Sequence, residues 1–195
     1  MLSTLYNNNS NEVTVGIDEA GKGCMIGRVY AAAVIWDPSK DASRIRDSKK
    51  ISRKNRKVLR EYIEKNCVAY GIGWASNTEI DEINISNATF NAMHRALDQI
   101  DVHFDRILVD GNRFKPYKCN VHSCIVGGDD QYVNIAAASI LAKEYHDEWI
   151  NNEFADDDKY DLMNNKGYGT KKHIEGIKKY GVTSYHRTLY CSKYT

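Results

Sequence analysis

Four carboxylates stand where predicted strands end, and their positions suggest one shared site. Asp18 and Glu19 close an apolar run and enter a glycine-rich turn, GIDEAGKG. Asp110 ends the apolar run RILVD, and Asp129 follows a Gly-Gly pair after the next predicted strand. Because the strand ends of an open α/β sheet line a common crevice, these acids can converge there.

Converging carboxylates repel one another, and a divalent cation removes that conflict. Oxygen ligands without a neighbouring set of His or Cys favour Mg²⁺ or Mn²⁺ over zinc. Two such ions about 4 Å apart would clamp a phosphodiester, one activating water and the other stabilising the leaving oxygen. Adjacent strand residues point to opposite faces, so the strand is expected to end or bulge at Asp18 and Glu19. A structural role for Asp18 in a turn is the alternative.

The elements that must position these acids follow from the apolar patterns. Alternating or continuous apolar runs predict strands at residues 13–18, 28–36, 67–75, 106–110 and 120–126. Apolar residues at three- and four-residue spacing predict helices at residues 53–66, 87–100, 131–154 and 171–180. Three early strands followed by alternating helices and strands predict an α/β domain with a mixed sheet covered by helices.

The net charge of the chain is close to zero, although two segments of it are strongly basic. The 195 residues include 27 Lys and Arg against 26 Asp and Glu, a net charge of +1, which taken alone argues against a nucleic-acid binder. Residues 44–60 nevertheless hold nine basic residues and one acid, and residues 159–195 hold eight basic residues and two acids. Two blocks flanking a cluster of acids can follow a phosphate backbone, although a solvated helix face explains either block on its own.

Length and composition suit one globular domain. The chain is 42% hydrophobic and 27% charged, which excludes a disordered tail, a collagen-like fibre and a disulfide-scaffold peptide. No run approaches the ~18 apolar residues of a membrane span. We expect residues 1–12, which are polar, to form a flexible lead-in and residues 13–195 to form a single domain. Five cysteines without a Cys-x-x-Cys pair indicate a reduced, cytoplasmic protein.

Six segments, in order along nearly the whole chain, resemble type 2 ribonuclease H, or ribonuclease HII. They are GIDEAGKG (16–23), DSKKIS (47–52), INISNATFNAM (83–93), LVDGN (108–112), GGDDQYVNIAAASILAKEYHDEW (127–149) and KGYGTKKHIEGIKKYGVTSYHR (166–187). The resemblance implies a ribonuclease H-like fold with a central five-stranded mixed sheet flanked by helices, and a C-terminal helical region. It also assigns the family's four catalytic, metal-binding acids to Asp18, Glu19, Asp110 and Asp129, with Asp130 as second choice for the last.

A glycine loop and a tyrosine are expected to read the substrate. The family's Gly-Arg-Gly loop falls on Gly21, Lys22 and Gly23, and would sense the ribose 2′-hydroxyl at an RNA–DNA junction. The family's junction-sensing tyrosine falls on Tyr168, whose ring would stack on the sugar downstream and whose hydroxyl would bond the loop. Lys22 replaces the usual arginine and loses its planar fork, so a weaker or rearranged grip on phosphate is expected. Cys24 replaces the usual proline.

These expectations describe a metal-dependent endoribonuclease. It would hydrolyse the RNA strand of RNA–DNA hybrids and cut duplex DNA 5′ to an embedded ribonucleotide, using two Mg²⁺ or Mn²⁺ ions and leaving 3′-hydroxyl and 5′-phosphate ends. The resemblance implies a monomer with no membrane partner. The lysines expected to hold phosphates are Lys22, Lys49, Lys50, Lys171 and Lys172.

Three alternatives remain at this point. Type 3 ribonuclease H carries an additional N-terminal domain. Only about a dozen residues precede the first predicted strand here, which disfavours that family. Four intact acids disfavour a hybrid-binding module without catalysis. An acidic structural metal protein would leave the two basic blocks unexplained.

Overall fold

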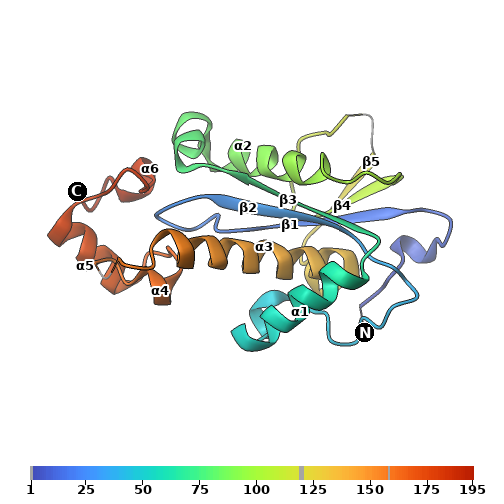
Figure 1. Ribbon diagram of the computed structural model, residues 1–195. Coiled ribbons are helices and arrows are strands. Elements are labelled where there is room, and N and C mark those ends of the chain that lie inside the picture. Colours follow the sequence, from blue (N-terminus) through green and yellow to red (C-terminus); the bar gives the residue numbers. More distant parts are fainter. Residues whose placement is uncertain (1, 119–120, 158) are drawn as a thin grey trace.

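A five-stranded mixed sheet forms the centre of the molecule (Figure 1). The computed structural model describes residues 2–118, 121–157 and 159–195. The strands are β1 (Thr14–Ala20), β2 (Val29–Ile35), β3 (Ala69–Ala75), β4 (Arg106–Asp110) and β5 (Val121–Ile125). Their order is β3-β2-β1-β4-β5, with β1 antiparallel to β2 and parallel to β4. The predicted mixed sheet is therefore confirmed, with strand limits within two residues of those expected.

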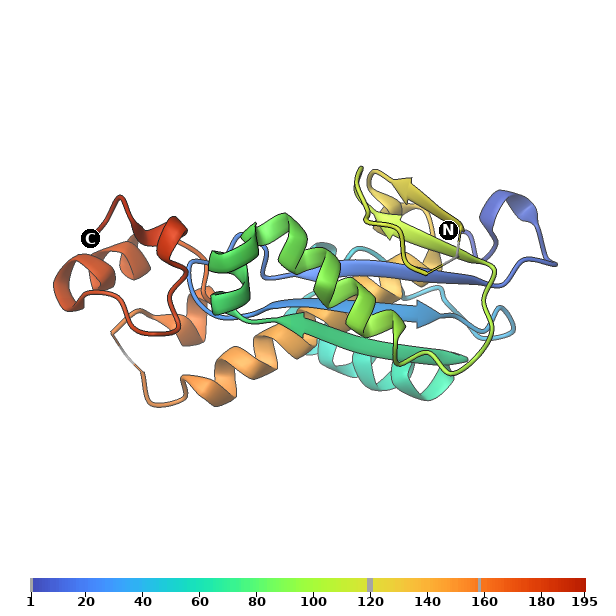
Figure 2. The same cartoon turned by 90° about the horizontal axis from the view of Figure 1, so that it is seen from above.

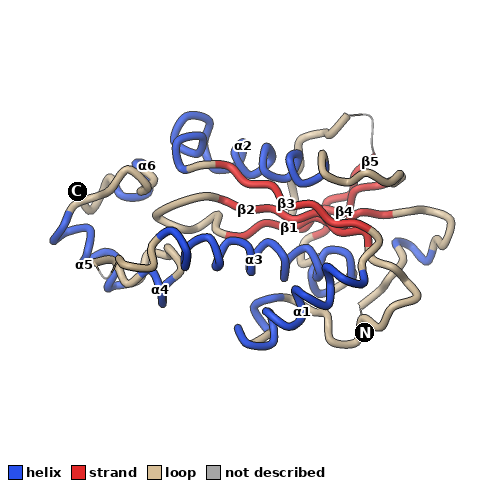
Figure 3. Tube along the Cα trace, viewed as in Figure 1, coloured by secondary structure: helices blue, strands red, loops and turns tan. Residues whose placement is uncertain are grey.

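Helices cover both faces of the sheet, as Figure 3 shows by element type. α2 covers one face, and α3 with α1 covers the other. Three short helices follow α3 in the C-terminal region. The helices are α1 (Arg53–Asn66), α2 (Asn77–Leu97), α3 (Val133–Glu153), α4 (Leu162–Asn165), α5 (Lys171–Tyr180) and α6 (Thr188–Cys191), with 3₁₀ turns η1 (Tyr6–Asn8), η2 (Ser48–Lys50) and η3 (Gly128–Asp130).

The start of α3 packs tightly onto β1, beside the strand end that carries the acids. A Cβ at Gly16 would lie 2.3 Å from the backbone carbonyl carbon of Asn134, so only glycine allows this approach. The following turns of α3 present buried alanines and isoleucines to the sheet. This contact fixes α3 against the strand that carries Asp18.

Two expectations about these elements were wrong. β1 neither ends nor bulges at Asp18 and Glu19, because both residues stay paired with β2. The helix expected at 87–100 begins ten residues earlier, at Asn77, where Ser76 and Glu79 form a capping box. Asn84, with φ of 67° and ψ of 162°, breaks this helix and so hides its first part from a periodicity search.

The C-terminal region and the N-terminus lie at opposite ends of the molecule (Figures 1 and 2). The loop between β1 and β2 packs into the C-terminal region, where Met25 and Ile26 join a core with Tyr160, Leu162 and Ile177.

The segment before β1 also contacts the domain. The backbone N–H of Ser3 donates to the Gln131 carbonyl (2.8 Å), and its own carbonyl accepts from the Val133 N–H (2.9 Å). Among the described residues, no helix has the length and apolar character needed to cross a membrane.

Candidate active site

Asp18 and Asp110 meet at the point where β4 ends. β1 and β4 run parallel, with Ile17 opposite Val109, so the next residues in register are Asp18 and Asp110. β4 stops at Asp110 while β1 continues to Ala20. The last residues of β1 are therefore not paired with β4, and the carboxylates of Asp18 and Asp110 lie where this pairing ends.

Asp18 is buried with other acids around it. Only 5% of the residue is exposed. Burial, followed by the charges of Glu19 and Asp110, holds the pKa of Asp18 well above its ordinary value. Hydrogen bonds from Ser139 of α3 and from the Glu19 N–H act in the opposite direction. An ionised Asp18 is consequently unfavourable until a cation reaches it.

Asp129 comes to the same place from the turn after β5. Gly127 adopts a left-handed conformation (φ 66°), and the Gly128 N–H then donates to Oδ1 of Asp110 (2.8 Å). Burial and the neighbouring charge of Asp110 raise the pKa of the Asp129 carboxyl. The Gly-Gly pair thus places Asp129 beside Asp110 and binds the two turns together.

Glu19 faces the opposite side of the sheet from Asp18. Its carboxylate accepts from Lys22 Nζ at 3.2 Å. A cavity of about 280 Å³ opens there, lined by Glu19, Lys22 and Asp110 together with Ser86 of α2 and Arg113. Neither Ser86 nor Arg113 lies in a strand-end pattern, so the sequence alone does not single them out.

Lys49, like Lys22, is a predicted lysine that the structure places beside the acids. Its Nζ lies 3.8 Å from Asp129 Oδ2 and 3.9 Å from Asp47 Oδ1. Desolvation lowers the pKa of Lys49, but the charges of Asp47 and Asp129, with smaller contributions from Asp18 and Asp110, raise it overall. The exposed ammonium groups of Lys49 and Lys22 only partly balance the clustered carboxylates.

The three remaining predicted lysines, Lys50, Lys171 and Lys172, are paired with acids outside the four. Lys50 Nζ lies 2.6 Å from Asp130, which is exposed. Lys171 and Lys172 occupy the first turn of α5, beyond Tyr168, where their ion-pair partners are Glu175 (3.8 Å) and Asp161 (3.9 Å). These long, exposed pairs leave both ammonium groups accessible to another anion.

The donor set fits a divalent cation by its chemistry. Asp18, Asp110 and Asp129 supply oxygen ligands at the end of β4, and their mutual repulsion is what a cation of this kind relieves. As the side chains stand, no group of three or more His, Cys, Asp or Glu among the described residues is arranged to hold a metal ion, so the acids would have to shift to bind one. Glu19 is turned to Lys22, so it would have to leave that ion pair to join the other acids.

The glycine loop is shaped by two different requirements. Gly21 has φ of +84°, and a Cβ there would lie 2.5 Å from the His146 ring, so packing alone demands glycine. At Gly23 the nearest atom to a Cβ would be Cε1 of Tyr168, at 3.8 Å. Because Gly23 has no side chain, the space beside the Tyr168 ring stays open to a ligand.

Tyr168 lies directly against this loop. Its backbone bridges to Cys24, and its hydroxyl lies within hydrogen-bond reach of the Gly21 backbone and the Cys24 thiol. Burial, with the nearby Cys24, raises the pKa of the Tyr168 hydroxyl, so this group remains a neutral phenol. The ring stays 37% exposed, with Lys143 Nζ 5.1 Å from its centroid.

Arg187 and two histidines support the site from the C-terminal region. The buried Arg187 guanidinium donates to the carbonyls of Lys22, Gly27 and Arg28, each at 3.0 Å. His173 Nδ1 donates to the Tyr168 carbonyl (3.0 Å), and its Nε2 lies 3.2 Å from Nε2 of the buried His186. His186 and Arg187 end the segment 166–187 that carries the family resemblance, but no local pattern shows what their side chains touch.

Comparisons with known proteins point to one family. A family model described as Ribonuclease HII matches residues 15–193. Ribonuclease HII of Christiangramia forsetii is 50% identical over 182 residues, which span 92% of this chain and 90% of the relative.

Solved structures share the fold. Ribonuclease H2 from Pyrococcus horikoshii OT3 has a TM-score of 0.77 at 22% identity, covering 93% of this chain and 96% of that one. Bst-RNase HIII in complex with Mn²⁺ has a TM-score of 0.67 at 18% identity, covering 90% of this chain and 65% of that one. These likenesses confirm the predicted ribonuclease H-like fold.

Proposed function

The chain belongs to the ribonuclease HII family of enzymes that cut RNA in RNA–DNA hybrids, and from this premise we propose that it also incises duplex DNA 5′ to an embedded ribonucleotide. The products would carry 3′-hydroxyl and 5′-phosphate ends. The observation that carries the proposal is the meeting of Asp18, Asp110 and Asp129 at the end of β4, beside a glycine loop and an exposed tyrosine.

Enzymes of this family depend on divalent metal ions. We propose that Asp18, Glu19, Asp110 and Asp129 hold two such ions, Mg²⁺ or Mn²⁺. The bound ions would supply an activated water and stabilise the leaving oxygen. Asp18 is best placed to be shared between them, since it lies between Glu19 on its own strand and Asp110 on the next. Lys49 would then be released from Asp129 to contact a phosphate.

The glycine loop and Tyr168 would recognise the ribose. The open space at Gly23 lets a sugar approach the backbone closely, and a backbone amide or carbonyl can bond a 2′-hydroxyl that DNA lacks. The exposed part of Tyr168 borders that space, while its hydroxyl lies near the Gly21 backbone and the Cys24 thiol. Lys22, Lys171 and Lys172 would contact phosphates on either side.

We further propose that the protein acts as a monomer in the cytoplasm. One chain supplies all four acids, the loop and the tyrosine. The four described cysteines, Cys24, Cys67, Cys124 and Cys191, are free thiols, which suits a reducing compartment.

A duplex containing a single ribonucleotide tests the proposed function. With Mg²⁺ or Mn²⁺ present, we expect one incision on the 5′ side of the ribonucleotide, with the end groups identified by a phosphatase-sensitive mobility shift. Asp18→Asn should not cut, whereas Asp101→Asn, which removes an exposed carboxylate elsewhere, should cut normally. Cleavage of long hybrids without incision of this duplex would leave the family activity intact and disprove the junction activity.

A further inference from the structure

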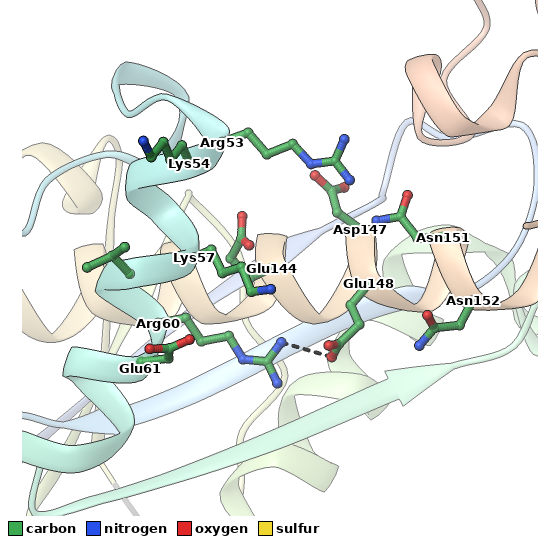
Figure 4. Close-up of a pocket in the computed structure, with 11 residues that line it drawn as sticks. Arg53, Lys54, Lys57, Arg60, Glu61, Glu144, Asp147, Glu148, Asn151 and Asn152 are labelled. Atoms are coloured by element: carbon green, nitrogen blue, oxygen red, sulfur yellow. Dashed lines mark hydrogen bonds and ion pairs between the residues drawn. The ribbon is translucent and has the colours of Figure 1, made fainter.

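A groove separate from the acids lies between α1 and α3 (Figure 4). Its volume is about 640 Å³. α1 lines one side with the cations Arg53, Lys54 and Lys57, and the last turns of α3 line the other. Figure 4 shows Arg53 reaching from α1 across the groove toward α3. None of these three cations belongs to the site described above.

The acids on the α3 side already have partners. Glu144 lies 2.8 Å from Arg56 Nε, and Glu148 lies 2.8 Å from Arg60 Nη1. Asp147 pairs with Lys143 Nζ at 2.9 Å. The α3 carboxylates of the groove are thus paired with Arg56, Arg60 and Lys143, and not with Arg53, Lys54 or Lys57.

Arg53, Lys54 and Lys57 have no ion-pair partner among the described side chains, and all three are exposed. They occupy little more than one turn of helix, about 6 Å along its axis. Glu61 on the same helix is the one exposed carboxylate of the lining without an ion-pair partner among the described side chains, so the unpaired groups are three cations against one acid.

This charge is continuous with the proposed active site. Arg53 follows Lys49 and Lys50 by only a few residues. Burial lowers the pKa of Lys166, which stands two residues before Tyr168, and Arg53 lies close enough for its charge to contribute to this lowering. Lys143 in turn lies over the Tyr168 ring. An anion that spans both places would pass along the surface of α3.

We propose that this groove binds backbone phosphates of one arm of the duplex substrate, outside the incision site. The inference rests on the proposed function for the choice of duplex. The unpaired ammonium and guanidinium groups of Arg53, Lys54 and Lys57 outnumber the single unpaired carboxylate of Glu61, and such cations bind phosphates without reading bases. Its lining holds no aromatic side chain on which a base could stack.

The test measures binding rather than cleavage, so that its failure is distinct from failure of the proposed function. Affinity for a ribonucleotide-containing duplex is measured in EDTA at several salt concentrations, for wild type and for Arg53→Gln with Lys57→Gln. The matched control is Lys40→Gln with Lys65→Gln, which removes two exposed charges outside the groove. We expect the groove variant to bind about tenfold more weakly and its slope of log affinity against log salt to fall by about 2, while the control keeps the wild-type slope.

Trimming the duplex locates the contact. On duplexes shortened from one end at a time, the difference between wild type and the groove variant should disappear for one arm only. Equal slopes for the groove variant and the control would overturn the proposal, as would a difference that survives trimming of either arm. Loss of affinity for a polyglutamate peptide, with an unchanged duplex slope, would instead assign the groove to an acidic protein.

Discussion

Arg187 and Lys22, 165 residues apart in the chain, are joined by a hydrogen bond of 3.0 Å from Nη1 to the Lys22 carbonyl oxygen. The same buried guanidinium also holds the carbonyls of Gly27 and Arg28. One side chain of the C-terminal region therefore fixes three points of the loop between β1 and β2. The loop proposed to read the ribose depends on that region for its position.

Arg187→Lys should loosen the loop without removing the charge. A single ammonium cannot reach three carbonyls in different directions, and buried charge-assisted hydrogen bonds are lost. We expect the melting temperature to fall by roughly 5–10 °C and ribonucleotide incision to fall by about tenfold or more.

The rise in melting temperature on adding Mn²⁺ shows whether Arg187→Lys disturbs only the loop or also the acids. If Arg187 positions only the loop, Mn²⁺ should still raise the melting temperature of Arg187→Lys as much as that of wild type. Arg44→Lys, an exposed substitution, serves as the control. An Arg187→Lys variant that no longer responds to Mn²⁺ would mean that the acids, and not the loop, depend on Arg187.

The sequence predicts the acids well because their signal is local. Apolar runs that end on Asp18 and Asp110 mark buried strands, and parallel pairing places their ends together. The face that each acid uses was not predictable in this way. β1 continues past Asp18 to Ala20, whereas β4 stops at Asp110. The site therefore forms where β1 is no longer paired with β4, and not at a bulge in β1.

Contacts between distant segments leave no such local signal. Arg187 could be recognised as part of a motif, but its three carbonyl partners are set by the packing of the C-terminal region on the loop. The first part of α2 was missed for a different reason, since the left-handed Asn84 interrupts the apolar spacing. The groove beside α1 likewise depends on which acids of α3 are already paired.

Asp18→Asn should abolish cleavage and stabilise the metal-free protein. Because folding raises the pKa of Asp18, its favourable contribution exists below the unfolded value and is lost as pH rises through the folded value. At pH 7.5 without metal, the raised pKa of Asp18 therefore makes folding less favourable, and the amide, which does not titrate, removes this cost. We expect the melting temperature in EDTA to rise by roughly 3–6 °C, measured by calorimetry.

Adding metal should reverse the order of the melting temperatures of wild type and Asp18→Asn. Mn²⁺ should raise the melting temperature of wild type and have a much smaller effect on Asp18→Asn, since binding to the folded state alone stabilises it. Asp101→Asn should match wild type in both conditions. An equal Mn²⁺ response in wild type and Asp18→Asn would exclude Asp18 as a ligand.

The histidine pair should make the C-terminal region sensitive to acid. His186 Nδ1 accepts from the Thr183 N–H (2.9 Å), so protonating it would place two donors face to face. Burial, with the nearby His173, lowers the pKa of His186 to about 4, and burial also lowers the pKa of His173. A lowered histidine pKa means that stability is full above about 6.5 and is lost as pH falls toward 4.

We therefore expect the free energy of unfolding to fall by on the order of 1–2 kcal/mol between pH 7 and pH 5 on account of this pair. Asp18 acts in the opposite sense over part of this range, so the quantity to measure is the difference between wild type and His186→Gln. His103→Gln, at an exposed position, is the control. A His186→Gln variant with the same pH dependence as wild type would rule out the pair as its source.

Tyr168→Phe should separate junction incision from cleavage of long hybrids. The change keeps the ring beside Gly23 but removes the hydroxyl that reaches the Gly21 backbone and Cys24. With the loop less firmly held, we expect incision at a single ribonucleotide to fall by about tenfold, and hydrolysis of a continuous RNA strand, which offers many ribose contacts, by less than threefold. The measurement is the ratio of the two kcat/KM values, with the exposed Tyr180→Phe as control. A ratio equal to that of wild type would remove the Tyr168 hydroxyl from junction recognition.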